Sequence, residues 1–105
     1  MSEETREQTH AVGAAAVGLS LRPNDLLIFG NAKVGTPLIQ SAETIGIDLP
    51  LKVLVWQDAE GNTWLSYNDP AWLARRHGLG PDAEATIKTL AGALAAVTAA
   101  AAGSP

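Results

Sequence analysis

The chain lacks cysteine altogether and has few residues of several other types. It carries one methionine, one phenylalanine, one tyrosine and seven basic residues among its 105. Without cysteine there is no disulfide, no thiolate metal site and no thiol nucleophile. Eleven acidic residues give a net charge of -4, and the largest basic cluster is the pair Arg75-Arg76. A surface that binds phosphate backbones needs more positive charge, so we expect no nucleic-acid partner.

Long hydrophobic runs and metal-binding spacings are also missing. No apolar run is as long as a signal-sequence core or a membrane span, so we expect a cytoplasmic protein without a membrane partner. The two histidines, His10 and His77, do not occur in the spacing of a metal-binding motif. The sequence therefore predicts no metal site, and no motif indicates a cofactor.

The length allows one small domain. A chain of 105 residues buries only about 60 to 65% of its unfolded surface, and much of its apolar content is alanine, which adds little buried area. A partner subunit would cover more of it. We expect a single α+β domain over residues 9–98, a polar N-terminal tail over residues 1–8 and a frayed C-terminal tail over residues 99–105.

The first half of the chain shows short elements. Residues Thr9 to Gly18 fit a strand, a helix, or both in succession, because the segment consists mostly of small residues with two glycines and shows no clear hydrophobic period. The run Leu26 to Phe29 is apolar, too short for a helix and followed by glycine, so it predicts a buried central strand. Thr36 and Pro37 have the residue types of a helix start, and we expect that helix to end near Glu43 or Thr44.

A hairpin follows. Residues Leu51 to Gln57 place apolar side chains on both faces of a strand, and the segment DAEGN suits a three-residue loop with Gly61 in the left-handed conformation. A second strand then runs from Thr63 to Tyr67. This register places Trp56 opposite Trp64.

The last part of the chain is helical. Asp69 and Pro70 predict the cap and first residue of a helix that Gly78 ends. A final helix begins near Pro81 and Asp82. Its core-facing stripe has helical spacing and consists of Ile87, Leu90, Leu94 and Val97.

The segment GNAKVGT lies between the predicted strand and helix, where a phosphate-cradling loop belongs. The nucleotide-binding P-loop has lysine directly after its second glycine, whereas this chain has Thr36 there. Lys33 lies inside the loop as a partial substitute for an anionic small molecule. We favour a tight turn shaped by Gly30 and Gly35, with Asn31 bonded to its backbone.

Few residues carry obvious chemistry. His10 stands beside small residues, where its ring can project into a cleft. Asp48 precedes Leu49-Pro50 and is either a general base or, as we favour, the cap of a turn. His77 lies in the last turn of its helix with two arginines, and we expect all three to complement the helix dipole.

Three strings of the sequence carry a family resemblance: IFGNAKVGTPLIQ, GIDLPLKVLVWQD and GNTWLSYNDPAWLARRHGL. Together with His10 and GLSLRP they resemble the bacterial domain-of-unknown-function family 302 over about Thr9 to Leu79. The resemblance implies a TBP-like β-α-β(4)-α domain, commonly a homodimer, with no established activity. The recurrent positions of the family correspond here to His10, Gly30, Asn31, Gly35, Thr36, Asp48, Pro50, Tyr67 and Asn68.

The chain departs from the family pattern in two places. Ala32 stands where proline usually follows the Gly-Asn pair, and only nine residues precede His10, where the family has a strand and a long helix. We therefore expect an N-terminally truncated form of the fold, with an antiparallel sheet of three to four strands and helices packed on one face. Such a sheet leaves apolar surface for another chain to cover.

These observations favour a small homodimeric domain that binds an undetermined small ligand. Its expected binding residues are Asn31, Lys33, Gly35, Thr36, Tyr67 and Asn68. Two alternatives stay open. One is an acid-base enzyme in which His10 and Asp48 exchange a proton with substrate. The other is a structural accessory subunit that docks through its exposed sheet.

Overall fold

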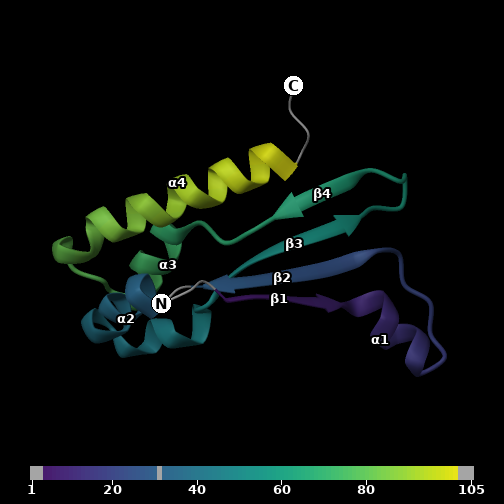
Figure 1. The fold of residues 1–105 in the computed structure, drawn as a ribbon, viewed down its shortest axis with the longest axis horizontal. Helices are drawn as coiled ribbons and strands as arrows, with labels where there is room; N and C mark the ends of the chain where they lie inside the picture. The colour runs from purple at the N-terminus through teal and green to yellow at the C-terminus, as the bar shows by residue number, and fades with distance from the viewer. Residues whose placement is uncertain (1–3, 31, 102–105) are drawn as a thin grey trace.

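The computed structural model describes residues 4–30 and 32–101 of the chain. Its centre is a four-stranded antiparallel sheet in the order β1-β2-β3-β4, which is also the chain order (Figure 1). The strands are β1 (Glu4–Thr9), β2 (Asn24–Gly30), β3 (Leu51–Gln57) and β4 (Thr63–Ser66). The expected α+β class, with an antiparallel sheet of three to four strands, is confirmed.

Four α-helices and two short 3-10 helices join and flank the strands. In chain order they are α1 (His10–Ala16), α2 (Ala32–Ser41), η1 (Glu43–Asp48), α3 (Pro70–His77), η2 (Pro81–Ala83) and α4 (Glu84–Ala101). Figure 1 shows α1 at one end of the sheet and α2 and α3 at the other. Helix α4 runs back along β4 from that second end.

The N-terminal segment differs from the expected polar tail. Residues Glu4–Thr9 form β1, which pairs with β2 along its whole length, and α1 follows directly at His10. The segment gives no apolar signal because β1 is an edge strand, and its backbone hydrogen bonds hold it to the sheet. Of the alternatives for Thr9 to Gly18, the structure has the helix, since β1 ends at Thr9 and α1 covers His10 to Ala16.

Helix α2 also differs from its prediction. It begins at Ala32 rather than Thr36, and it ends at Ser41, so Pro37 lies inside it. Proline lacks an N–H group and leaves one helical hydrogen bond unmade. The first turn of α2 therefore occupies part of the segment where we expected a tight turn that ends at Gly35.

The hairpin confirms its prediction. Asp58 to Asn62 connect β3 and β4, Gly61 has a φ of +86°, and its N–H donates to the Asp58 carbonyl. Trp56 pairs with Trp64 in the register, and their rings stack with centroids 6.1 Å apart. The only difference is that β4 ends at Ser66 instead of Tyr67.

The boundaries of α3 follow the sequence signals. Asp69 is the N-cap, and its side chain accepts a hydrogen bond from the Ala71 N–H at 3.0 Å. Pro70 is the first helical residue, and Gly78 ends the helix with a φ of +69°. These local signals position the C-terminal residue His77, which matters for the site described below.

The hydrophobic core lies on one face of the sheet, under α4 and α3. Leu51 and Val53 of β3 point to this face and pack with Leu73 and Leu94, which is completely buried. Val97 is 49% exposed, so the expected stripe of α4 is buried only in its first part. The helix itself continues through Ala101, past the expected start of fraying at residue 99.

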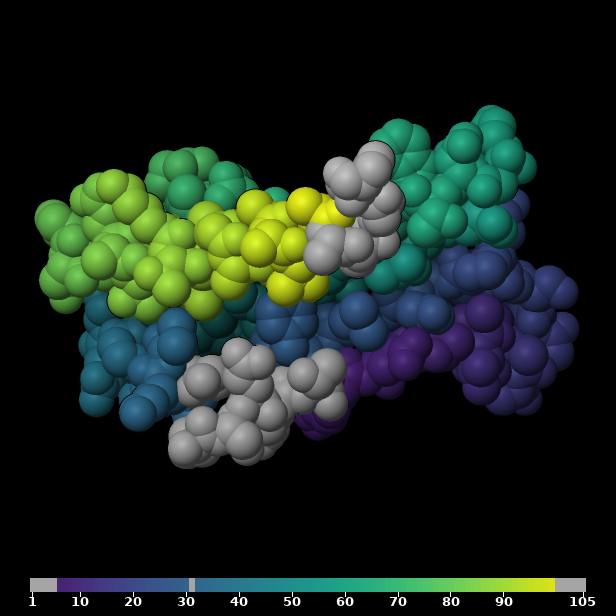
Figure 2. Space-filling view, turned by 45° about the horizontal axis from the view of Figure 1, so that its top comes forward, coloured from purple at the N-terminus to yellow at the C-terminus, as the bar shows by residue number. Residues whose placement is uncertain are grey.

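The opposite face of the sheet carries apolar side chains that lie outside the core cluster of the described residues. In the strand register, Leu26, Ile28, Leu54 and Trp56 alternate with the core-facing residues and so point away from the core. Among the described residues, none of these four packs against the core cluster. Figure 2 shows in addition that parts of β2 and β1 are open to solvent beside α4. The helices thus cover the sheet incompletely.

Candidate functional site

Three segments meet at the end of the sheet that carries α2. A Cβ atom on Gly30 would lie 2.8 Å from the Cβ of Pro50, so the end of β2 passes directly beside this proline. A Cβ on Gly35 would lie 3.7 Å from Leu49 Cδ1. The first turn of α2 therefore rests on the segment that follows η1. This packing explains glycine at position 30, where any side chain would collide with Pro50.

Asp48, at the end of η1, joins this region to the end of α3. Arg76 donates from Nη1 to both carboxylate oxygens, each at 3.1 Å. His77 lies 2.5 Å from Oδ2 through its Nε2. Asp48 was expected to cap a turn or act as a base, and the structure makes it the common acceptor of two side chains from another helix.

The imidazole of His77 has a second partner. Its Nδ1 lies 2.9 Å from Thr44 Oγ1, while its side chain is only 6% exposed. A carboxylate can only accept hydrogen bonds, so in the neutral ring Nε2 carries the proton that is donated to Asp48. Nδ1 is then an acceptor, and Thr44 donates its hydroxyl proton to it. The result is a continuous hydroxyl, imidazole and carboxylate chain.

The importance of His77 was missed in the sequence. We assigned it to the helix dipole together with Arg75 and Arg76, yet its ring faces η1, which lies about 30 residues earlier in the chain. Arg76 also lies over the ring of Trp72, with its guanidinium carbon 5.8 Å from the ring centroid. The available sequence signal was the Gly78 cap, which fixes the end of α3, but no local signal indicated what faces that end.

His10 does not take part in this cluster. Thr9, the last residue of β1, pairs with Asp25 near the start of β2, and Asp25 pairs with Val55 near the end of β3. Leu51, the first residue of β3, pairs with Phe29 near the other end of β2. His10 thus follows β1 at one end of the sheet, and Asp48 precedes β3 at the other (Figure 1). The two side chains do not converge on one cavity, as the acid-base pair His10 and Asp48 requires.

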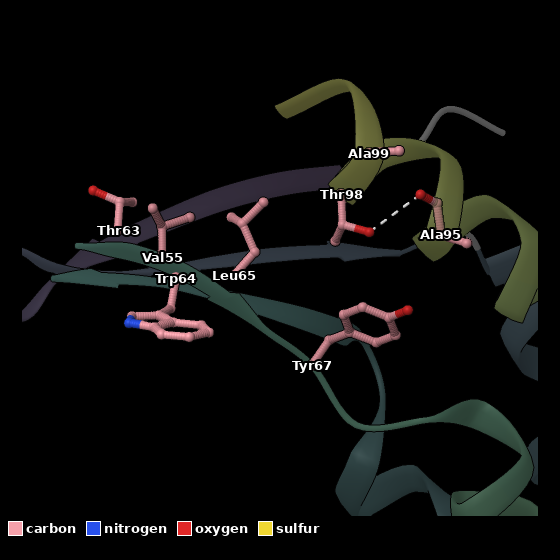
Figure 3. Close-up of a pocket in the computed structure, with 8 residues that line it drawn as sticks. All are labelled: Val55, Thr63, Trp64, Leu65, Tyr67, Ala95, Thr98 and Ala99. Atoms are coloured by element: carbon pink, nitrogen blue, oxygen red, sulfur yellow. Dashed lines mark hydrogen bonds between the residues drawn. The ribbon is translucent and has the colours of Figure 1, made fainter. Parts of the chain in front are cut away.

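A groove of about 610 Å³ lies between β4 and the C-terminal half of α4. The side chains of Val55 and Leu65 point from the sheet toward α4, where Thr98 and Ala99 lie (Figure 3). The side chain of Trp64 points to the opposite side of β4. The lining is completed by Thr63, Tyr67 and Ala95. Five of these eight side chains are apolar and three carry a hydroxyl, and no charged residue of the described chain is among them.

The polar groups of the groove are available for a ligand. Thr98 donates its hydroxyl proton to the carbonyls of Leu94 and Ala95, which leaves its oxygen free to accept. Within the described part of the chain, the Tyr67 hydroxyl makes no hydrogen bond. β4 is the last strand of the sheet, so the backbone of its outer edge is unpaired by any described strand. The groove therefore offers an apolar wall with a few hydrogen-bonding groups.

Of the expected ligand-binding residues, the structure brings only Tyr67 to this groove. Lys33, Gly35 and Thr36 lie in α2, and Asn68 follows Tyr67 without lining the groove. Asn31 lies outside the described residues. The five described positions therefore do not form one site. The alternation of inward and outward side chains in the hairpin could have indicated that Val55 and Leu65 share one face of the sheet. It did not show that α4 passes beside that face.

Asp58 ties the hairpin loop to Trp64 of β4. Its carboxylate accepts hydrogen bonds from the Trp64 indole at 2.8 Å and from the backbone N–H groups of Asn62 and Glu60. These bonds stabilise the charged form and lower the pKa of Asp58, the indole bond most strongly. The carboxylate thus holds the indole of Trp64 beside the hairpin loop, on the side of β4 that faces away from Thr98.

No helix among residues 4–30 and 32–101 is both long and apolar enough to span a membrane. Within the same residues, no three His, Asp or Glu side chains lie together in an arrangement that could hold a metal ion.

Known proteins give a family but no activity. A crystal structure of an uncharacterized conserved protein from Bacillus stearothermophilus superimposes with a TM-score of 0.72 at 21% identity, over 87% of this chain and 70% of that one. Relatives named "Fluoride-specific ion channel FluC 1" from Brucella suis biovar 1 and "FluC 2" from Brucella melitensis biotype 1 are each 49% identical over 90% of this chain. This chain spans only 37% and 35% of their lengths. The family described as "Domain of unknown function DUF302" matches residues 5–97, so the resemblance is confirmed and the chain belongs to this family.

Proposed function

We propose that this protein is a small-ligand-binding domain whose ligand occupies the groove between β4 and α4. The observation that carries the proposal is the groove itself, whose volume of about 610 Å³ lies in the range of small-molecule sites. Its lining combines apolar side chains with the hydroxyls of Tyr67 and Thr98. This combination is typical of sites that bind an apolar molecule and orient it through a few polar contacts.

The lining also limits the class of ligand. The described groove residues carry no charge to neutralise a charged group, and burying an unpaired charge is costly. We therefore expect an uncharged aromatic or aliphatic body, with any charged group left in water. The open edge of β4 and the Tyr67 hydroxyl supply hydrogen bonds for one or two polar atoms.

A fluorescent apolar probe tests this assignment. Anilinonaphthalene sulfonate should bind saturably to the folded protein, with its ring system in the groove and its sulfonate in solvent. The variant Ala95→Phe fills the groove and should weaken binding at least about tenfold. Ala96 is exposed on the same helix but does not line the groove, so Ala96→Phe is the matched control. Equal binding by both variants would overturn the proposal.

The homodimer remains part of the proposal. Its support is the second sheet face, where Leu26, Ile28, Leu54 and Trp56 lie outside the core cluster of the described residues and are half-buried. A second copy placed face to face would bury these residues as two packed sheets do. Light scattering should give twice the mass of the chain, and Leu54→Lys should shift the protein to monomer. A wild-type monomer at high concentration would contradict this part.

An accessory role is the second candidate. The Brucella relatives are named fluoride-specific ion channels, and the matching segment is only about a third of their length. The same kind of domain is therefore present inside a longer protein of that name. Removing the matching segment from the Brucella suis relative should change its rate of fluoride efflux from vesicles. An unchanged rate would dismiss this candidate.

A further inference from the structure

The hydroxyl, imidazole and carboxylate chain at the end of α3 is not needed for binding in the groove. Thr44 and Asp48 belong to η1 and His77 to α3, and none of them lines the groove. We propose that Thr44 is a nucleophile that accepts an acyl group from a small activated ester, with His77 as its general base and Asp48 as the residue that positions the imidazole.

The hydrogen bonds fit this role in order and direction. Thr44 Oγ1 is 2.9 Å from His77 Nδ1, within the distance needed for proton transfer from a nucleophile to its base. Asp48 accepts from the opposite ring nitrogen, so in the neutral imidazole Nδ1 is the nitrogen that lacks a proton. Arg76 contacts both oxygens of Asp48 and so helps to hold the carboxyl group against the imidazole.

The base is buried, whereas the nucleophile is exposed to solvent. The side chains of His77 and Asp48 are 6% and 13% exposed, whereas Thr44 lies on the surface. Within the described residues, the only hydrogen-bond partner of the Thr44 side chain is His77, so its hydroxyl does not cap η1. A small molecule can reach the hydroxyl, while the base and its orienting group stay protected.

The neighbouring side chain suggests the kind of acyl group. In a 3-10 helix, residues three positions apart lie on the same side, which places Ile47 beside Thr44. Ile47 is 72% exposed. A short aliphatic acyl chain bound to Thr44 would find an apolar contact there.

The reaction balances without a cofactor. Thr44 Oγ bonds to the ester carbonyl carbon, and the hydroxyl proton moves to His77 Nδ1. The bond to the leaving oxygen breaks, and that oxygen takes the proton from Nδ1 and departs as an alcohol. Water then attacks the acyl-threonine, its proton passes through Nδ1 to Thr44 Oγ, and a carboxylic acid is released.

The experiment uses p-nitrophenyl acetate and the full chain. Nitrophenolate release is followed by absorbance, and the acetylated residue is located by peptide mass spectrometry after a short reaction. General-base activation contributes about 100-fold or more, so Thr44→Val should lower the rate of release at least tenfold. Thr44→Ser keeps the hydroxyl and should retain the activity. Thr89 is an exposed threonine on α4 that is hydrogen-bonded to Ala85, and Thr89→Val is the control.

The roles of the other two residues need their own readouts. Asp48→Asn should lower the rate and change its pH profile, because the amide no longer fixes the tautomer of His77. His77→Gln should abolish labelling of Thr44, and His10→Gln controls for acetylation of an ordinary histidine. Circular dichroism confirms that each variant is folded. Acetyl groups found only on lysine or histidine, or an unchanged rate in folded Thr44→Val, would overturn the proposal.

Discussion

His77 Nε2 donates a hydrogen bond to Asp48 Oδ2 at 2.5 Å, and this contact fastens the end of α3 to η1. We expect Asp48→Asn to lower the free energy of unfolding by about 1 to 3 kcal/mol, because it weakens the acceptor of two side chains, one of them nearly buried. Urea unfolding measures the change. Arg76 is 47% exposed, so Arg76→Ala should cost less, about 1 kcal/mol at most. Equal losses of unfolding free energy in Asp48→Asn and Arg76→Ala would contradict the idea that the bond to His77 is the main one.

Gly30 should not tolerate a side chain. A Cβ there would lie 2.8 Å from Pro50 Cβ, a separation that forces one backbone to move. We expect Gly30→Ala to destabilise the protein by about 1 to 3 kcal/mol. Gly92, exposed in the middle of α4, has no neighbouring atom within 4 Å of such a Cβ. Thermal unfolding of Gly92→Ala should therefore show a stabilisation of about 0.5 to 1 kcal/mol.

Leu94 should contribute most of the packing energy of α4. Its side chain is completely buried in the core, so Leu94→Ala should cost about 2 to 5 kcal/mol. Val97 is 49% exposed one turn later on the same helix, and Val97→Ala should change stability by only about 0.5 kcal/mol. Denaturant midpoints of the two variants provide the comparison. Similar losses would show that the C-terminal half of α4 is packed against something else in solution.

Asp58 should make the stability of the hairpin depend on acid pH. Its pKa is lowered in the folded state, first by the Trp64 indole, so the carboxylate adds stability above its unfolded pKa and loses it as the pH falls through the folded pKa. Asp58→Asn should remove this pH-dependent part. The difference between wild type and variant in thermal midpoint should be largest near neutral pH and shrink in acid. Asp82→Asn, at an exposed carboxylate, serves as the control.

Elements with strong local signals were predicted well. Helix α3 begins and ends where Asp69, Pro70 and Gly78 predicted, and the β3–β4 hairpin has Gly61 in the expected conformation. Helix α2 and strand β1 were misplaced. Thr36 and Pro37 have the residue types of a helix start, but α2 begins four residues earlier, at Ala32. Strand β1 is polar and is held by backbone pairing with β2, which its side chains do not indicate.

For the candidate sites, the sequence indicated Asp48 and Tyr67 but not what surrounds them. Thr44 and His77 are 33 positions apart, and Tyr67 and Thr98 are similarly distant in the chain. In the motif that looked most like a binding loop, the residues from Ala32 to Thr36 belong to the start of α2. Lys33, Gly35 and Thr36 therefore do not line the groove that contains Tyr67.

The sequence by itself determined the family, the α+β class, the hairpin and the capped helix α3, because turn residues and hydrophobic alternation act over a few neighbouring positions. Only the tertiary structure decided that His77 meets Asp48 and Thr44, and that α4 passes beside β4 to form the groove. These contacts depend on how separate elements pack around the core, and no local pattern in the chain records that packing.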